Sequence, residues 1–167
     1  MSTTDGVPDE VVAPEVAEVG DVVLRPPTVY APLEVRAVEM VLPAANPVLV
    51  LVEQSAPYRT LRIPVGMAEG NAIAFALRGI ETPRPLTHTL VIELLERFSL
   101  TLEAVRIPAR DGATYLAELL VSGPSGLETL ACRPSDGVAL ALRQRLPAPI
   151  TASLALLEEA GLVPDGS

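Results

Sequence analysis

Three strand-like segments follow one another in the first half of the chain, with only short connections between them. They are rich in apolar and β-branched residues: LEVRAVEMVL (33–42), PVLVLVEQ (47–54) and YRTLRIPVG (58–66). The connections, at PAANP and at Ser55-Ala56-Pro57, are turn signals. Such short connections predict an antiparallel meander, because parallel neighbours need a long crossover. By strand alternation Arg59 and Arg62 are not expected on the same core-facing side, and we expect both to be solvated or at an edge.

The hydrophobic period then changes to that of helices. MAEGNAIAFALRG (67–79) ends in Arg78-Gly79, a typical helix stop. Its second half is apolar on nearly every face, so we expect this helix to be buried between other elements. In the next helix Thr87 is the candidate N-cap. A stripe at helical spacing follows it: Leu90, Val91, Leu94, Leu95 and Phe98.

Strand patterns return in the second half of the chain, at 100–109, 114–123 and 126–132. The first two flank a hairpin turn built on Asp111-Gly112. Two helices follow, one beginning at RPSD (133–136) and one at 153–161. Strands in runs and helices in pairs predict an α+β fold, with a largely antiparallel sheet and packed helices in one compact domain.

The first 27 residues differ in composition from the rest. They carry six acidic residues against one arginine, with four prolines and no helical or strand period. We therefore predict a disordered acidic tail at 1–27 and a folded domain at 28–164. The chain has a net charge of −9, most of it from this tail. That acidity argues against extended nucleic-acid binding, but leaves room for an enzyme that contacts a few phosphates in a local arginine pocket.

The single cysteine, Cys132, cannot form an internal disulfide, which predicts a protein of the reducing cytoplasm. It also excludes metal sites built from several thiolates. No apolar run approaches the roughly eighteen residues that span a bilayer, and the first ten residues lack the pattern of a signal peptide. We expect no membrane contact. The sequence contains no dinucleotide fingerprint, P-loop or zinc-protease motif.

Two Arg-Pro pairs begin helix-like runs, and both combine a hydroxyl residue with an ionisable one. Because proline disfavours the helical conformation of the residue before it, Arg84 and Arg133 should be extended and stand just outside their helices. The N-terminus of a helix binds anions, and an adjacent arginine strengthens such a site. Two of these ends facing each other could hold a phosphodiester. His88 and Asp136 would then be the titratable groups at hand.

A purely structural role explains the same residues, and the residue types alone favour it. Ser135 or Asp136 would be an N-cap, and an acid in the first turn suits the helix dipole. Arg133 would pair with a carboxylate such as Glu69 or Asp136. His88 would only satisfy a backbone carbonyl. Ion-pair networks of this kind imitate active sites.

Taken together, the motifs resemble the bifunctional nuclease domain family of bacteria and plants. In family order the matching segments are NPVLVLVE, RTLRIPVGMAEGNAIAFALRG, PRPLTHTL, RDGATYLAEL and RPSDGVALALR followed by PI, which cover about residues 34–161. The resemblance implies a compact α+β domain, usually a homodimer, that cleaves RNA and DNA. It carries these polar positions onto this chain: Glu69, Arg84, His88, Arg133, Ser135 and Asp136.

The first functional hypothesis is a weak nuclease that depends on a divalent metal. His88 would act as general acid or base, while Glu69 and Asp136 would hold Mg²⁺ or Mn²⁺. The phosphate would contact Arg84, Arg133 and Ser135.

Two departures from the family pattern remove acidic residues. The family usually reads THDL and DARPSD, whereas Thr89 and Ala131 stand here in place of the acids. If the family holds a metal through carboxylates, this chain has lost two of them. The second hypothesis is therefore a catalytically inactive dimeric module, which binds a protein or a small anionic ligand through the same pocket.

Overall fold

A computed structural model describes residues 27–40 and 46–163, so the predicted acidic tail lies outside the described residues except for its last position. The strands are β1 (Tyr30–Met40), β2 (Pro47–Glu53), β3 (Thr60–Pro64), β4 (Thr101–Ile107), β5 (Arg110–Asp111), β6 (Thr114–Tyr115), β7 (Ala117–Gly123), β8 (Gly126–Cys132) and β9 (Ile150–Ser153). The helices are α1 (Met67–Leu77), α2 (Thr87–Arg97), α3 (Pro134–Arg143) and α4 (Leu154–Ala160).

Seven strands form one sheet in the order β3-β2-β1-β9-β4-β7-β8. The predicted meander β1-β2-β3 is antiparallel throughout, and β4-β7-β8 makes a second antiparallel meander. Between them β9 pairs antiparallel with β1 and parallel with β4. The α+β fold and the largely antiparallel sheet predicted from the sequence are therefore confirmed. The strand β9 was not predicted, since it has only four residues and follows two prolines.

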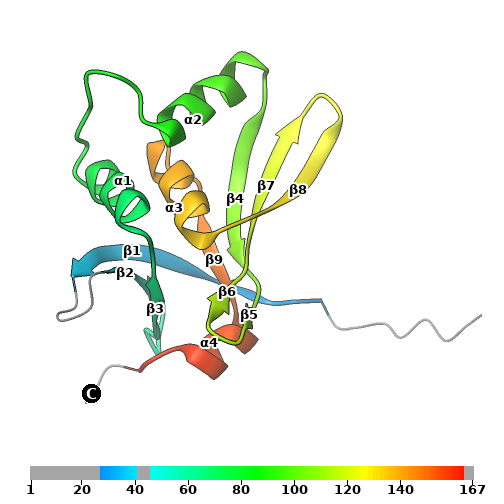
Figure 1. The fold of residues 1–167 in the computed structure, drawn as a ribbon. Coiled ribbons are helices and arrows are strands. Elements are labelled where there is room, and N and C mark those ends of the chain that lie inside the picture. The colour runs from blue at the N-terminus through cyan, green and yellow to red at the C-terminus, as the bar shows by residue number, and fades with distance from the viewer. Residues whose placement is uncertain (1–26, 41–45, 164–167) are drawn as a thin grey trace, which may run out of the picture.

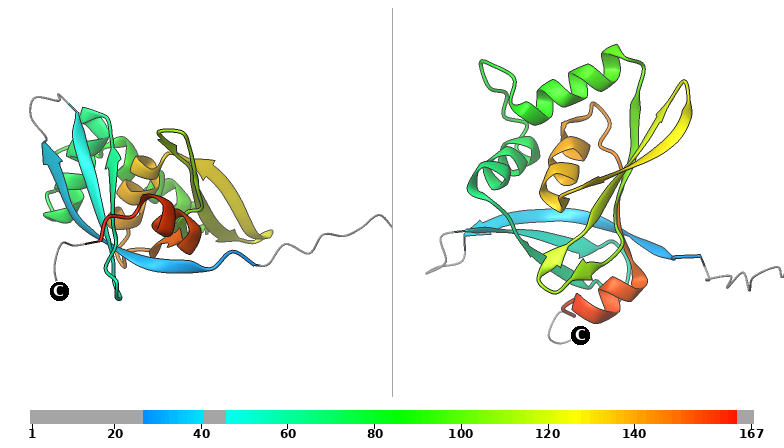
Figure 2. Two further views of the ribbon diagram at one scale, coloured as in Figure 1. Left: turned by 90° about the horizontal axis from the view of Figure 1, so that it is seen from below. Right: turned by 45° about the vertical axis from the view of Figure 1, so that its right-hand side comes forward.

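Helices α1, α2 and α3 lie on the same side of the sheet, and α3 lies in the angle between the two meanders (Figures 1 and 2). Helix α4 packs near β9 and β3 at the opposite end of the molecule (Figure 1). Within the described ranges, no helix has the length and apolarity needed to cross a membrane.

Helix α3 is the most deeply buried of the helices, and a glycine lets it approach the sheet. A Cβ atom at Gly137 would lie 2.8 Å from Cγ1 of Val105 and 3.3 Å from Sγ of Cys132, so a side chain there would push the helix away. By contrast, α1 buries only Gly70, Ala72 and Ile73. The prediction that α1 is buried on most sides was wrong, because it packs on α3, β1 and β2 and leaves the rest of its surface open.

The predicted helix starts were wrong in detail. The residues that flank α2 and α3 at the N-terminal end are Leu86 and Arg133, and neither side chain caps its helix. Thr87 is instead the first residue of α2. In α3, Pro134 takes the first helical position, where its missing N–H costs nothing, and this moves the start upstream of Ser135. Ser153 does act as a cap, since its Oγ accepts a hydrogen bond of 3.1 Å from the N–H of Leu156.

A buried ion pair closes the turn between β2 and β3. Glu53 is only 4% exposed, and its two carboxylate oxygens accept bonds of 2.9 Å from Nε and Nη2 of Arg59. Hydrogen bonding from this guanidinium lowers the pKa of Glu53. Of the two expected environments, Arg59 is thus not solvated, but it lies directly before the edge strand β3. Arg62 does lie on the edge strand β3 and is exposed, where it pairs with Glu39 at 2.7 Å.

These two arginines provide a matched comparison. We expect Arg59→Ala to lower the free energy of unfolding by about 3 kcal/mol, because Glu53 would be left as a buried charge without its partner. Arg62→Ala removes an exposed pair and should cost less than about 1 kcal/mol. Urea denaturation of both variants measures the difference. Equal losses would contradict the distinction between the two pairs.

Candidate functional site

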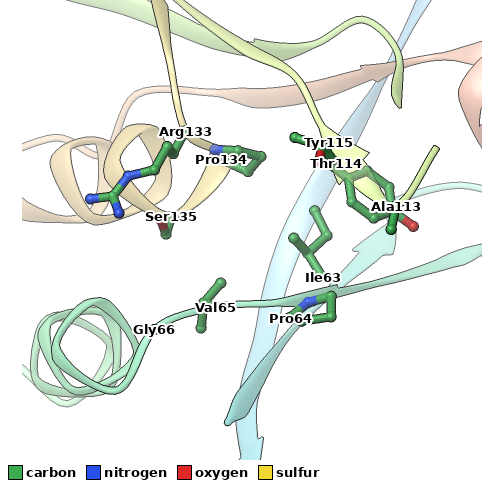
Figure 3. Close-up of a pocket in the computed structure, with 10 residues that line it drawn as sticks. All are labelled: Ile63, Pro64, Val65, Gly66, Ala113, Thr114, Tyr115, Arg133, Pro134 and Ser135. Carbon is green, nitrogen blue, oxygen red and sulfur yellow. The ribbon is translucent and has the colours of Figure 1, made fainter. Parts of the chain in front are cut away.

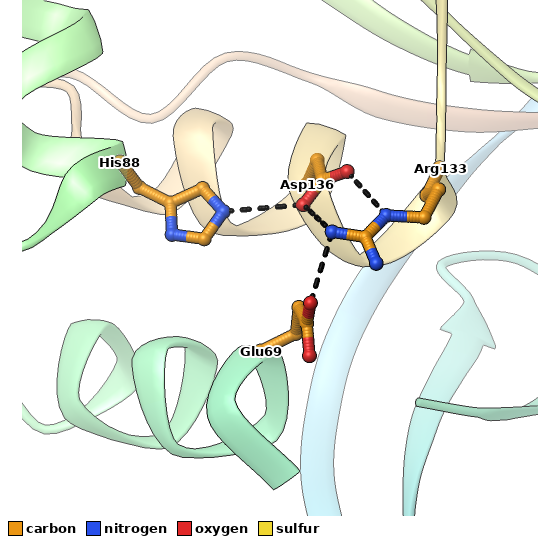
Figure 4. Close-up of polar contacts among 4 residues, drawn as sticks. All are labelled: Glu69, His88, Arg133 and Asp136. Atoms are coloured by element: carbon orange, nitrogen blue, oxygen red, sulfur yellow. Dashed lines mark hydrogen bonds and ion pairs between the residues drawn. The ribbon is translucent and has the colours of Figure 1, made fainter. Parts of the chain in front are cut away.

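Four of the six predicted site residues meet where α1, α2 and the start of α3 come together (Figure 4). The guanidinium of Arg133 donates to both carboxylate oxygens of Asp136, from Nε at 2.7 Å and from Nη2 at 3.0 Å. The same Nη2 lies 2.9 Å from Oε1 of Glu69. On the other side, Nε2 of His88 lies 3.3 Å from Oδ1 of Asp136. The four side chains form one continuous polar network.

Local backbone features place these side chains. Arg133 has φ −79° and ψ 147°, the extended conformation predicted from the proline that follows it. Its side chain therefore leaves the backbone outside α3 and can reach α1. Glu69 lies in the first turn of α1, where its charge also suits the helix dipole. Gly66 makes room for it, since a Cβ at this position would overlap the Glu69 carboxylate.

The charges of the network stabilise one another. Burial raises the pKa of Asp136, but the hydrogen bonds from Arg133 and His88 outweigh burial, and the net effect lowers the pKa. The hydrogen bond to Asp136 likewise raises the pKa of Arg133. The side chain of Arg133 is nevertheless 66% exposed. The structural pair foreseen for Arg133 thus exists with both Asp136 and Glu69, although the arginine end of it faces solvent.

A pocket of about 460 Å³ opens beside the network, between α1, α2 and α3. His88, Arg133, Glu69 and Asp136 all line it. Asn71 and Phe75 of α1 line it as well, among other residues, and neither was predicted from the sequence. Asn71 and Phe75 are four residues apart and so share one face of α1, but this spacing becomes informative only once that face is known to border the pocket.

A second, smaller hollow of about 250 Å³ lies on the other side of Arg133 (Figure 3). Ser135 and Tyr115 line this hollow and not the first one, and Arg133 lines both. Ser135 is buried in the first turn of α3. The structure therefore separates Ser135 from His88, although the sequence suggested one shared site.

Arg84 stands apart from the network. It is exposed in the connection between α1 and α2, where its carbonyl accepts a 2.6 Å hydrogen bond from the Thr82 hydroxyl. Within the described part of the chain, no ion pair involves Arg84, and it lines neither of the two hollows beside Arg133. The two Arg-Pro elements therefore do not bring Arg84 and Arg133 together at one site. On the α2 side, it is His88 that reaches the pocket.

The two positions that differ from the family pattern also lie outside the network. Thr89 lines a separate hollow near Arg143, on another side of α2 from His88. Ala131 is exposed on β8, two residues before Arg133. Neither position belongs with Glu69, His88 and Asp136 in this arrangement. The two lost acids therefore do not remove any of the four side chains that form the polar network.

The donor groups as placed do not fit a divalent cation. The guanidinium of Arg133 bridges the carboxylates of Glu69 and Asp136 and takes the oxygens that a cation would need. Across residues 27–40 and 46–163, no group of three or more His, Cys, Asp or Glu residues has the geometry of a metal site. Burial raises the pKa of the neighbouring Cys132 to about 11, so this thiol is neutral and a poor ligand.

The model of the family described as "Bifunctional nuclease domain" matches residues 49–165. Two proteins of Mycobacterium tuberculosis are each 40% identical over 126 residues, which is 75% of this chain and 73% of the relative. They are "Uncharacterized protein MT1877" of strain CDC 1551 / Oshkosh and "Uncharacterized protein Rv1829" of strain ATCC 25618 / H37Rv. Neither name states an activity.

The lowered pKa of Asp136 predicts an acid dependence of stability. Above the ordinary carboxyl value of 3.8 the stabilising contribution of this carboxylate is fully present, and it is lost as the pH falls through the lower folded value. We expect Asp136→Asn to lower the free energy of unfolding at neutral pH and to flatten its decrease at acidic pH. Urea denaturation measured from neutral to acidic pH tests this expectation, with Glu128→Gln on the exposed strand β8 as control. Parallel profiles for the wild type and Asp136→Asn would contradict the assignment.

Proposed function

Because the chain belongs to the bifunctional nuclease domain family, we propose that it hydrolyses phosphodiester bonds of RNA or DNA in the pocket between α1, α2 and α3. The family expected from the sequence motifs is confirmed by the match over residues 49–165. One observation carries the proposed activity: His88 and Arg133 line the same pocket, and Asp136 is bonded to both.

His88 is the group suited to move a proton. With the ring tautomer that carries hydrogen on Nε2, it donates to Asp136, and Nδ1 keeps a free lone pair. That nitrogen can accept the proton of an attacking hydroxyl or water. Asp136 fixes the orientation of the ring and stabilises the imidazolium that forms. This role follows the sequence-based assignment of His88 as general acid or base.

Arg133 is the group suited to contact the phosphate, since its exposed guanidinium presents planar N–H donors to the pocket. Two carboxylates already bind this guanidinium, however. With His88 neutral, one arginine faces the two carboxylates of Glu69 and Asp136, which leaves the network with a net charge of −1. A phosphate must therefore compete with these carboxylates, and the proposed activity is that of a weak nuclease.

A bound Mg²⁺ or Mn²⁺ on Glu69 and Asp136 remains a prediction from the sequence. Such an ion would supply a Lewis acid beside the phosphate. It would need both carboxylates at the expense of their bonds to Arg133. The proton transfer to His88 does not involve such an ion, and cleavage that stops in EDTA would show that one is needed.

A second candidate function is a module without catalysis that binds a protein or a small anionic ligand through the same pocket. The specific observation in its favour is that Arg133 already satisfies both carboxylates. A network of this kind stabilises the contact between α1 and α3 whether or not any chemistry occurs.

A cleavage assay with labelled single-stranded RNA and DNA tests the nuclease proposal, with Mg²⁺, Mn²⁺ and EDTA arms. We expect cleavage by the wild type to fall about 10²–10⁴-fold in His88→Ala, because the proton acceptor is removed. A His88→Ala/Asp136→Asn double variant purified identically should be equally inactive. Arg133→Ala should also lose cleavage, whereas Arg84→Ala, outside the network, should retain it.

The variants separate the two candidates. Equal traces of cleavage in the wild type and the double variant would mean a contaminating nuclease, and the module would then be the better account. Retained cleavage in Arg133→Ala together with loss in Arg84→Ala would place the phosphate contact in the connection between α1 and α2 and overturn the proposed site. Circular dichroism of each variant confirms that loss of cleavage does not reflect loss of fold.

A further inference from the structure

Helix α3 ends at Arg143, whose guanidinium is only partly satisfied by the protein. Within residues 27–40 and 46–163, Nη2 of Arg143 is the one buried side-chain nitrogen or oxygen that has no hydrogen-bond partner. In the same ranges the guanidinium makes a single hydrogen bond, of 3.2 Å, from Nη1 to the carbonyl of Ile80. A buried donor without a partner is unfavourable, and more so when it belongs to a charged group. A ligand that offers an acceptor to this guanidinium is therefore favoured.

The positive charge of Arg143 also lacks a counter-charge. In the part of the chain that the structure describes, no ion pair involves this arginine. Its place in the last turn of α3 suits the helix dipole, which accounts for a positive charge at this position. The dipole does not account for the unbonded Nη2, since it supplies no acceptor to that atom.

Arg143 lines a hollow of about 330 Å³, which is separate from the pocket beside His88. The other walls come from α2, which packs on α3, and from the connection before α2 (Figure 1). Pockets that hold small molecules begin at about 300 Å³, so this hollow has room only for a small ligand. The residues that line it are Glu81, Thr82, Pro85, Thr89, Glu93 and Arg143. They bring one arginine and two glutamates to the same hollow.

We propose that this hollow binds a small zwitterion of the free α-amino acid class, with its carboxylate on Arg143 and its ammonium towards Glu81 and Glu93. A guanidinium binds a carboxylate through two parallel N–H bonds, and Nη2 would be one of the two donors. The proposal is independent of the proposed nuclease activity, since none of the residues that line this hollow belongs to the polar network.

The mixed charge of the hollow selects a ligand that carries both charges. An anion without an ammonium group would be attracted by Arg143 but repelled by the two glutamates. A cation without a carboxylate would meet the opposite difficulty at Arg143. In an α-amino acid the two charged groups are separated by a single carbon, so both can be placed in a hollow of this size.

The position of Thr89 supports a carboxylate as the partner of Arg143. The family pattern has an acid at position 89, and Thr89 lines the hollow together with Arg143. An acid there would place a carboxylate of the chain itself in the hollow. With threonine at this position, the carboxylate comes from a ligand.

Thermal unfolding followed by circular dichroism tests the proposal, with L-alanine as the probe. We expect L-alanine to raise the Tm of the wild type saturably, by about 3–6 °C at roughly ten times its dissociation constant. Acetate provides the carboxylate alone and methylammonium the ammonium alone. At matched ionic strength, neither should reproduce the shift.

Two variants locate the carboxylate of the ligand. Arg143→Gln should lose the response to L-alanine, whereas Arg145→Gln should keep it, because Arg145 is exposed and does not line this hollow. Thr89→Asp should also lose the response, because its own carboxylate would occupy the place of the ligand. If Arg143→Gln does not fold, Thr89→Asp decides.

A further pair of variants locates the ammonium group. Glu93→Gln should weaken the response to L-alanine and strengthen the response to acetate, because it removes a negative charge from the hollow. Glu96→Gln is the matched control, since Glu96 lies on the same helix but outside the hollow. It should respond as the wild type does.

Three results would overturn the proposal. The first is a wild type whose Tm shows no saturable shift with L-alanine. The second is an equal shift with acetate, which would make the hollow a plain anion site. The third is a response to L-alanine that persists in both Arg143→Gln and Thr89→Asp, which would place the ligand elsewhere on the molecule.

Discussion

The pairing of β9 with both β1 and β4 is the interaction on which the sheet depends. Without this short strand the two meanders would be separate three-stranded sheets. Ile150 is aligned with Leu33 of β1 on one side and Val105 of β4 on the other, and all three are buried. The next element is fixed at the same place, since Ser153 ends β9, caps α4 and donates to the carbonyl of Pro108. The angle between the meanders, in which α3 lies, follows from this junction.

The candidate site is a consequence of how α3 lies against the sheet. Gly137 permits the close approach, and Pro134 fixes where the helix begins, so Arg133 emerges extended towards α1. Asp136 then lies in the first turn between His88 and Arg133, and its carboxylate is hydrogen-bonded to both. The position of α3 and the point at which it begins therefore place Arg133 and Asp136 without a dedicated loop.

Much of the fold could be predicted from the sequence, because period and turn signals are local. The hairpin at Asp111-Gly112 and the end of α1 at Gly79 are examples, and both glycines have positive φ. β9 could not be predicted, since four residues carry too little pattern. The structure brings together Glu69, His88, Arg133 and Asp136, four of the six positions that the family resemblance singled out, and it separates Arg84 and Ser135 from His88. The direction in which a side chain points depends on how its helix docks, which is a long-range property.

Glu69 and Asp136 share one partner, Arg133, and this has a thermodynamic consequence. Arg133 borders two hollows and neutralises two carboxylates at once. An anion that drew the guanidinium towards itself would leave Glu69 and Asp136 without their counter-charge, and its binding free energy would be reduced by the cost of separating these pairs. By linkage, a change at either carboxylate that weakens its pair with Arg133 must strengthen anion binding at this arginine by the same free energy. The strength with which Arg133 can hold an anion is thus set by two other side chains as well as by its own charge.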